Sequence, residues 1–336
     1  MAKIIKLHDG SEFELNDAMV RLVDTVASLN DDDAVFFQRQ LEFIETQTYD
    51  TLYPDLEARE SLGVDTTGGA GIQTLTYRSF NHVGSAKVIN ARATDLPKPN
   101  ISGTEYSIPV KSVGCAYDYD IDEIASAAVT GLPLETRKAM AATRGYEQYV
   151  NSAAWYGDAA GGFVGFFQNA DVTKADAPKG AASTADTTWP TKTPAEILAD
   201  LNAPVNQMYA TTLKIMRPSE IWLPVARYQL IKNLARSDQS DKTVLNYFVE
   251  NNEFITSVGQ VKQLNALAGQ GKSGSECMVV ICRMVQGLKT FRLREPLPLT
   301  WQPVQLHGLV YEIPGRGRFA GFQVMYPAAI TIYSGI

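Results

Sequence analysis

The chain has 336 residues, of which 45% are hydrophobic and 20% are charged, a composition typical of globular proteins. This length exceeds the size at which one core usually divides, so we expect two lobes or one domain with large excursions. The net charge of −7 and the isoelectric point near 5.1 argue against a protein whose main task is to grip nucleic acid.

The cysteine count and the amino-terminal sequence indicate a cytoplasmic protein. Cys115, Cys277 and Cys282 are an odd number of cysteines in a long chain, which favours a reducing compartment over a disulfide framework. Residues 1–16 lack the apolar stretch of a signal peptide, and no apolar run reaches the length of a membrane span. We therefore expect no membrane partner.

The amino-terminal region alternates in polarity on both sides of an Asp-Gly pair, which predicts a hairpin over residues 3–15. Asn16 is the predicted cap of a first helix, and the acidic run 31–33 precedes a second helix over 34–50. Neither helix is long enough to fold alone, so both need a partner surface.

Residues 63–119 change to a period of two, which predicts strands over 72–80, 85–93 and 104–110. The stretch is polar at alternate positions and poor in large apolar residues, so it cannot carry a core of its own. We expect a long two-stranded excursion whose exposed edge invites pairing with another chain.

From residue 121 onward the sequence predicts two helices, an α+β lobe and returning strands. A short helix is predicted over 121–130 and a long helix over 133–156, which ends in the glycine-rich turn 157–165. Residues 170–193 have the composition of a surface loop. Thr193 and Glu196 form a capping box for a helix that opens an α+β lobe over 191–284, and the rest of the chain returns to strands.

Two glycine-rich segments imitate phosphate-binding loops without meeting their requirements. Gly157 and Gly162 have the right spacing, but Phe163 and Val164 replace the required Lys and Ser or Thr. The segment 266–275 ends in Gly-Lys-Ser, but a strand follows it, so no helix N-terminus is available. We expect loops here, and a nucleotide-binding enzyme remains an unlikely alternative.

The common catalytic and metal-binding patterns are absent from the sequence. His8, His82 and His307 lie in three distant segments, and Cys277 and Cys282 point to opposite faces of one predicted strand. No nucleophile elbow or paired-cysteine motif occurs. We therefore expect no enzyme, no cofactor and no metal.

The charged residues on the predicted strands can be interpreted either as a solvated surface or as a contact with another molecule. Asp118, Asp120 and Asp122 share one face of a strand, which indicates a solvated or an intersubunit acidic face. A set of basic residues near the carboxyl terminus is more often a solvated face, although it could also touch DNA or a neighbour's acids. This set is Arg283, Lys289, Arg292, Arg294, Arg316 and Arg318.

The order of these parts resembles the major capsid proteins of tailed bacteriophages. The resemblance covers roughly residues 35–336 and depends on the succession of five segments. They are FFQRQLEFIETQTYDTLYPDLEARESLGV, IQTLTYRSFNHVGSAKVI, YDYDIDEIASAAVTGLPLETRKAMAATRGYEQYVNSAAWYGD, VLNYFVENN and GRGRFAGFQVMYPAAITIYSG.

This resemblance implies an α+β capsid fold that is also seen in encapsulin shells. Its implied parts are an N-terminal arm (1–62), an extended loop (63–110), a peripheral domain (111–190) with a spine helix (133–156), an axial domain (191–284) and return strands (285–336). Glycines at the base of the loop would act as hinges during maturation of a procapsid. These glycines are Gly68, Gly69, Gly71 and Gly103.

The implied function is self-assembly through pentamers and hexamers into an icosahedral virion capsid around double-stranded phage DNA, in the cytoplasm of the bacterial host. Further implied partners are scaffolding, portal and decoration proteins, with DNA bound without sequence specificity. An encapsulin-like shell around an enzyme cargo is the alternative. The predicted intersubunit residues in the extended loop are Tyr77, Arg78, His82, Lys87, Arg92 and Lys98.

Overall fold

The computed structural model describes residues 3–6, 12–15, 53–88, 96–130, 134–180, 187–237, 239, 241–265 and 276–336. The chain divides into two units, Met1–Pro54 and Asp55–Ile336. In the first unit, strands β1 (Lys3–Lys6) and β2 (Glu12–Leu15) pair antiparallel, which confirms the predicted hairpin. The two helices predicted within 16–50 lie outside the described residues.

A five-stranded sheet in the second unit has both of its faces covered. Trp222 and Val279 lie in one buried cluster with Trp155 and Phe166, whereas Ile221 and Val280 lie in another with side chains from the helices. Burial on both faces explains the continuous apolar sequence of its central strand. The sheet order is β7 (Thr173–Asp176), β18 (Ile330–Ser334), β10 (Cys277–Ile281), β8 (Glu220–Leu223) and β9 (Ser257–Gln260).

Three helices of the predicted α+β lobe are present close to their predicted bounds. They are α6 (Pro194–Thr211), α7 (Val225–Asn233) and α8 (Val244–Asn251). The predicted capping box is confirmed, because Thr193 Oγ1 accepts from the backbone of Glu196 and the Glu196 carboxylate accepts from the backbone of Thr193. The sheet of this lobe takes β7 and β18 from outside residues 191–284.

The surface loop predicted for 170–193 is wrong in two places. Strand β7 pairs parallel with β18, and the short 3-10 helix η1 (Trp189–Thr191) begins at a fully buried tryptophan. The sequence of β7, Thr-Lys-Ala-Asp, carries no apolar alternation, so its strand conformation depends on pairing with a distant segment.

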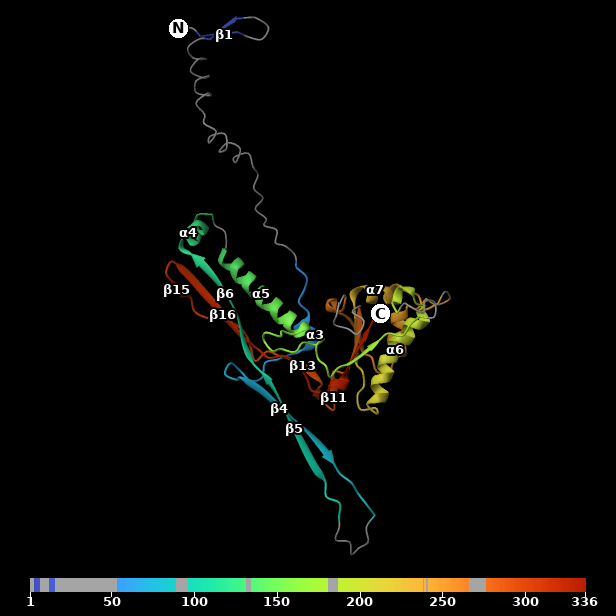
Figure 1. Cartoon of the computed structure of the whole chain (residues 1–336). Helices are drawn as coiled ribbons and strands as arrows, with labels where there is room; N and C mark the ends of the chain where they lie inside the picture. Colours follow the sequence, from blue (N-terminus) through green and yellow to red (C-terminus); the bar gives the residue numbers. More distant parts are fainter. Residues whose placement is uncertain are drawn as a thin grey trace. The chain divides into compact units, whose positions relative to one another are not determined.

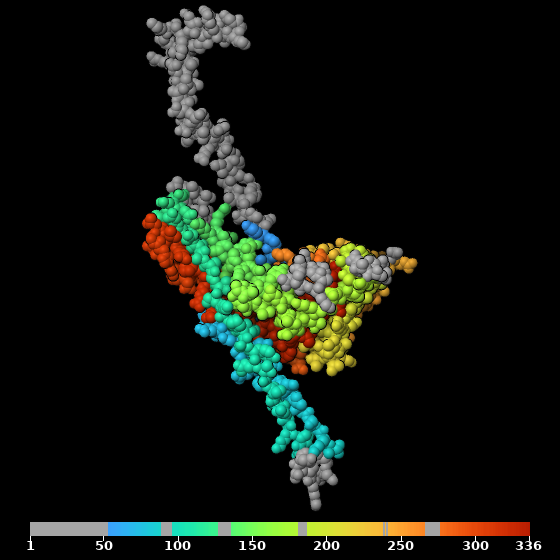
Figure 2. Space-filling model, in the orientation of Figure 1, coloured from blue at the N-terminus to red at the C-terminus, as the bar shows by residue number. Residues whose placement is uncertain are grey.

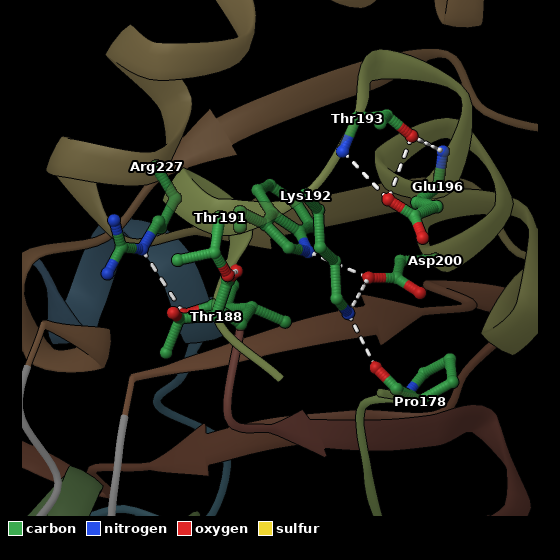
Figure 3. Close-up of polar contacts among 10 residues, drawn as sticks. Pro178, Thr188, Thr191, Lys192, Thr193, Glu196, Asp200 and Arg227 are labelled. Carbon is green, nitrogen blue, oxygen red and sulfur yellow. Dashed lines mark hydrogen bonds and ion pairs between the residues drawn. The ribbon is translucent and has the colours of Figure 1, made fainter. Parts of the chain in front are cut away.

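A buried ion pair fixes this segment to α6 (Figure 3). Lys192 Nζ lies 2.6 Å from Asp200 Oδ2 and donates to the carbonyl of Pro178, and the Trp189 indole donates to the same carboxylate. Burial raises the pKa of Asp200 above its ordinary value, although Lys192 and Trp189 oppose that shift. The pair thus joins three chain segments inside the lobe.

The helix α5 (Leu134–Tyr156) confirms the long helix predicted over 133–156 and packs against a second, antiparallel sheet. Its carboxyl-terminal half buries Tyr146, Val150 and Ala153. Gly317 on the sheet is required by this contact, since a Cβ there would lie 2.1 Å from Tyr146 Oη. The sheet consists of β14 (Leu297–Trp301), β16 (Val310–Phe319), β15 (Gln305–His307) and β6 (Lys111–Asp120).

Gly157 ends α5 as predicted. Its φ angle is +73°, and its N–H donates to Ala153 O at 3.0 Å, which is the usual geometry of a glycine beyond a helix C-terminus. Phe163, Phe166 and Phe167 are buried beyond the turn. The glycines of this segment therefore turn the chain and let aromatic side chains return to the core.

The acidic strand predicted through Asp122 is shorter than expected. Strand β6 ends at Asp120, and helix α4 (Ile121–Thr130) begins at the next residue, so Asp122 lies in a first helical turn. Carboxylates are favourable there because they face the positive end of the helix dipole. Asp118 and Asp120 remain on the strand and are exposed.

Shorter elements connect these parts of the second unit. Helix α3 (Ala58–Leu62) leads into β3 (Val64–Asp65), which pairs parallel with β13 (Phe291–Arg294). Strand β17 (Gly321–Val324) completes that three-stranded sheet. The carboxyl-terminal strands predicted from 285 onward are thereby confirmed.

Candidate intersubunit surface

A two-stranded ribbon projects from the second unit (Figure 1) and confirms the predicted excursion. Strands β4 (Thr74–Val83) and β5 (Asn100–Pro109) pair antiparallel over their full lengths. The sequence predicts a further strand over 85–93. That prediction is wrong for residues 85–88, which are not in a strand, and residues 89–93 lie outside the described residues. None of the residues of β4 or β5 is buried, and Figure 2 shows the ribbon without cover on the visible side.

Near the end at which the ribbon joins the second unit, one of its two faces contacts its own chain. We call this the inner face. Tyr77 and Tyr106 stack with ring centroids 5.0 Å apart, and Tyr77 Oη donates to Val324 O on β17 at 3.4 Å. Burial, together with the neighbouring Tyr106, raises the pKa of Tyr77. This face is therefore partly occupied within the subunit.

The opposite face carries apolar side chains with no cover from the described part of the chain. Phe80 is 59% exposed and Ile101 is 61% exposed. The Phe80 ring lies over Gly103, where an added Cβ would be 3.1 Å from the ring. Arg78 Nε and Glu105 Oε2 form an exposed ion pair at 3.1 Å beside them. We call Arg78, Phe80, His82, Ile101 and Glu105 the outer face.

The structure distributes the predicted intersubunit residues over different environments. Arg78 and His82 lie on the outer face, whereas Tyr77 lies on the inner face against its own chain. Lys87 and Lys98 are exposed beyond the paired strands. Arg92 lies outside the described residues, and the intersubunit role of the whole set stays a prediction.

Sequence reasoning missed the two apolar residues that the outer face exposes most clearly. Strand alternation places Phe80 on the same face as Arg78 and His82, and the register brings Ile101 opposite His82. The position of Phe80 could have been found from that alternation. The position of Ile101 could not, because it depends on the register with β5.

One of the predicted hinge glycines is not at the base of the loop. Gly103 pairs with Phe80 in the middle of the ribbon, where its lack of a side chain accommodates the ring. Gly68 and Gly69 do lie at the base, and their φ angles of +123° and +71° favour glycine.

Arginines of β13 hold the chain just before the ribbon. Asp65 Oδ2 accepts from Arg292 Nη1 and, at 2.7 Å, from Arg294 Nη1, and Thr67 also donates to this carboxylate. Burial alone would raise the pKa of Asp65, but these hydrogen bonds and charges hold it well below its ordinary value. The cluster fixes the incoming strand β3 to β13.

Arg318, on β16, contacts both limbs of the ribbon at its root. Its Nη1 donates to Ala70 O at 2.6 Å and its Nη2 donates to Val110 O at 3.3 Å. The solvated face predicted for the basic residues is thus wrong for Arg292, Arg294 and Arg318, because the fold uses them to bind its own chain. Arg283 likewise forms two hydrogen bonds with Glu220.

An acidic, exposed region lies at one end of the antiparallel sheet. Asp118 on β6 pairs directly with Glu312 on β16, which places two like charges opposite each other. Asp120 is two pairs further along, and Ile121 and Leu309 are exposed beside it, joined by a backbone hydrogen bond. We call these five residues the acidic end of the sheet.

The described residues lack two other features, a membrane-crossing helix and a cluster of metal ligands. No helix among them is long and apolar enough to cross a membrane. Within the same residues, no group of three or more metal-ligating side chains comes together.

Comparison with solved structures shows a shared fold at low sequence identity. The capsid of Myoviridae phage XM1 has a TM-score of 0.73 at 16% identity, covering 89% of this chain and 98% of that one. The capsid protein of a native GTA particle has a TM-score of 0.56 at 12% identity, covering 91% and 99%. A chain from Mycobacterium phage Bobi has a TM-score of 0.57 at 9% identity, covering 91% and 98%.

Comparison of the sequence with family models gives a direct match. No curated protein matches the chain significantly, but the model of the major capsid protein family matches residues 84–336. That range includes the outgoing strand of the ribbon, the long helix and both large sheets. The chain belongs to the major capsid protein family.

Proposed function

We propose that many copies of this chain assemble through pentamers and hexamers into the icosahedral head shell of a phage. The observation that carries this proposal is the outer face of the ribbon, where Phe80 and Ile101 have no cover from the described part of their own chain. Burying such side chains against a neighbour contributes up to about 2 kcal/mol each. A closed shell repeats every contact, so each interface can be modest.

The acidic end of the sheet is the surface that we propose receives the ribbon of a neighbouring copy. Asp118 and Glu312 repel each other within one subunit, so an incoming cation would relieve an unfavourable pair. The ribbon carries Arg78 on its outer face and Lys98 next to β5. Exposed Ile121 and Leu309 offer apolar contact beside the acids.

The assembled shell would enclose double-stranded DNA in the virion without reading its sequence. A net charge of −7 is compatible with this role because confined DNA brings its own counterions. Scaffolding and portal proteins, and in some shells decoration proteins, are the expected partners. Assembly would take place in the cytoplasm of the bacterial host, with a procapsid preceding the mature shell, and the subunit's role would be structural, without catalysis.

The family match favours this function over the two alternatives considered from the sequence. A cargo-holding compartment shares the fold class, but the matched family is that of major capsid proteins, and three of the matched structures described above come from phage or GTA particles. A nucleotide-binding enzyme is supported by neither the family nor the fold.

The test is electron microscopy of the purified full-length chain, expressed alone and with its scaffolding partner. We expect closed shells from the unmodified chain. Phe80→Asp should abolish them because it places a charge in the apolar contact. Ser79→Asp is the matched control, since the neighbouring side chain points to the other face.

Two outcomes would contradict the proposal. Shell formation by Phe80→Asp at the level of Ser79→Asp would remove the outer face from the interface. An unmodified chain that stays monomeric at high concentration, even with its scaffolding partner, would contradict assembly itself.

A further inference from the structure

The root of the ribbon lies between two different kinds of attachment. Upstream, Asp65 is held by Arg292 and Arg294 of β13, and the β3 backbone pairs with the same strand. Downstream, Val110 leads directly into β6, which pairs with β16 over its full length. Between Asp65 and the first residue of β4 lie Gly68, Gly69 and Gly71. The segment that enters the ribbon between Asp65 and β4, the incoming limb, therefore contains a flexible stretch. The segment that leaves the ribbon at Val110, the outgoing limb, has no such stretch.

Arg318 connects these two limbs to the sheet beneath them. It pairs with Ser112 near the start of β6, so its side chain begins close to the point where the chain leaves the ribbon. Its guanidinium then donates to Ala70 O on the incoming limb and to Val110 O on the outgoing limb. The guanidinium is planar and its donor directions are fixed, so it holds the two acceptors in one orientation, whereas an ammonium on a flexible stem imposes no fixed direction on its acceptors.

The chemistry of Arg318 is unusual for a residue that only stabilises a core. The residue is 8% exposed, both of its acceptors named above are main-chain carbonyls, and Nε is buried without a partner among the described residues. Burying a guanidinium without a compensating carboxylate is costly. An arrangement that is unfavourable for stability is expected where the side chain is needed to hold other groups in position.

We propose that Arg318 is a positioning residue that sets the direction in which the ribbon leaves the subunit. Its two hydrogen bonds prevent the incoming limb from rotating about the glycines 68, 69 and 71, while Val110 N–H to Gln73 O keeps the two limbs together. The inference rests on the proposed function, because the direction of the ribbon decides which neighbour it reaches. Because Arg318 lies on the antiparallel sheet, that sheet determines the direction of the ribbon and therefore which subunit of the shell the ribbon contacts.

The test compares Arg318→Gln with Arg316→Gln in the full-length chain. Arg316 lies two residues away on the same strand and the same side, but it is exposed and pairs with Gly114 and Thr300. Amide hydrogen exchange should become about tenfold faster, or more, at residues 70–80 in Arg318→Gln. Exchange in β8 and β10 should stay unchanged in both variants, and Arg316→Gln should resemble the unmodified chain throughout.

Assembly supplies the second readout. Arg318→Gln should give fewer closed shells and more irregular ones by electron microscopy. Arg318→Lys should be intermediate, because an ammonium on a flexible stem keeps the charge and the donors but lacks the rigid fork of Nη1 and Nη2. If the unmodified chain forms shells and Arg318→Gln matches Arg316→Gln in exchange and in shell shape, the positioning role is wrong while the proposed function stands. If both Arg318 variants lose the protection of β8 and β10, Arg318 is a core stabiliser and the inference is overturned.

Discussion

Strand β10 and the β4–β5 ribbon show two opposite solutions for apolar residues in strands. All five residues of β10 are buried, between β8 and β18 and beneath side chains on both faces. No residue of β4 or β5 is buried, although Phe80 and Ile101 are as apolar as the residues of β10. Strand β10 has its cover within the chain, whereas the ribbon has apolar residues that the described part of the chain leaves uncovered.

The comparison separates stability from assembly. Substitutions around the five-stranded sheet should change the free energy of unfolding, because the subunit itself loses contacts. Substitutions on the outer face should leave that free energy unchanged and should alter only the association of subunits.

The largest expected effect lies in the buried ion pair of Lys192 and Asp200. Their side chains are 1% and 4% exposed, so Lys192→Met leaves a carboxylate buried without its cation and should cost about 3–5 kcal/mol. Lowering the pH should reduce this deficit, because protonation removes the buried charge of Asp200. Urea unfolding of the variant at several pH values measures both effects.

A double substitution provides the control for that prediction. Lys192→Met combined with Asp200→Leu should recover most of the lost stability, since apolar replacement of a buried pair is often neutral. A double variant as unstable as Lys192→Met alone would show that the hydrogen bonds to Pro178 and Trp189, and not the ion pair, hold this segment.

The same chemical change in the two regions makes the comparison direct. Ile221→Ala, at a fully buried position of β8, should cost about 2–5 kcal/mol. Ile101→Ala, on the ribbon, should change the free energy of unfolding by less than about 0.5 kcal/mol and should weaken shell formation. Equal losses of stability from the two variants, measured by urea unfolding of unassembled subunits, would erase the distinction between the regions.

A loss of stability smaller than those at Lys192 and Ile221 is expected at Asp65. Asp65→Asn removes the charge that Arg292 and Arg294 share and should cost about 1–2 kcal/mol at pH 7. The folded-state pKa of Asp65 is lowered, so its stabilisation is complete above its ordinary value of 3.8 and is lost as the pH falls below it. Urea unfolding should therefore show a constant difference from pH 7 to about pH 4 and a smaller one at lower pH. A difference that already disappears at pH 6 would contradict the role of this carboxylate.

Local sequence signals were sufficient where neighbouring residues determine the structure. The hairpin over 3–15, the cap formed by Thr193 and Glu196, the helix α5 and the turn at Gly157 all depend on residues within a few positions of one another. The two-stranded excursion followed from its period of two and from its shortage of apolar residues.

Features that depend on distant pairing were not accessible in the same way. Strand β7 is polar and exists through its partner β18, and the burial of Trp189 requires α6. The basic residues of β13 and β16 read as a solvated surface because the sequence does not show that Asp65, Ala70 and Val110 approach them. At the candidate site, alternation places Phe80 on a face, but only the register identifies Ile101 as part of it.

Hydrogen exchange in assembled particles, compared with dissociated subunits, tests most directly whether another copy covers the ribbon. An isolated two-stranded ribbon is marginally stable in water, so in the free subunit its amides should be far less protected from exchange than those of β10, although still measurably protected. We expect residues 74–83 and 100–109 to become strongly protected on assembly, while β10 is protected in both states. Equal exchange of the ribbon in both states would contradict the account.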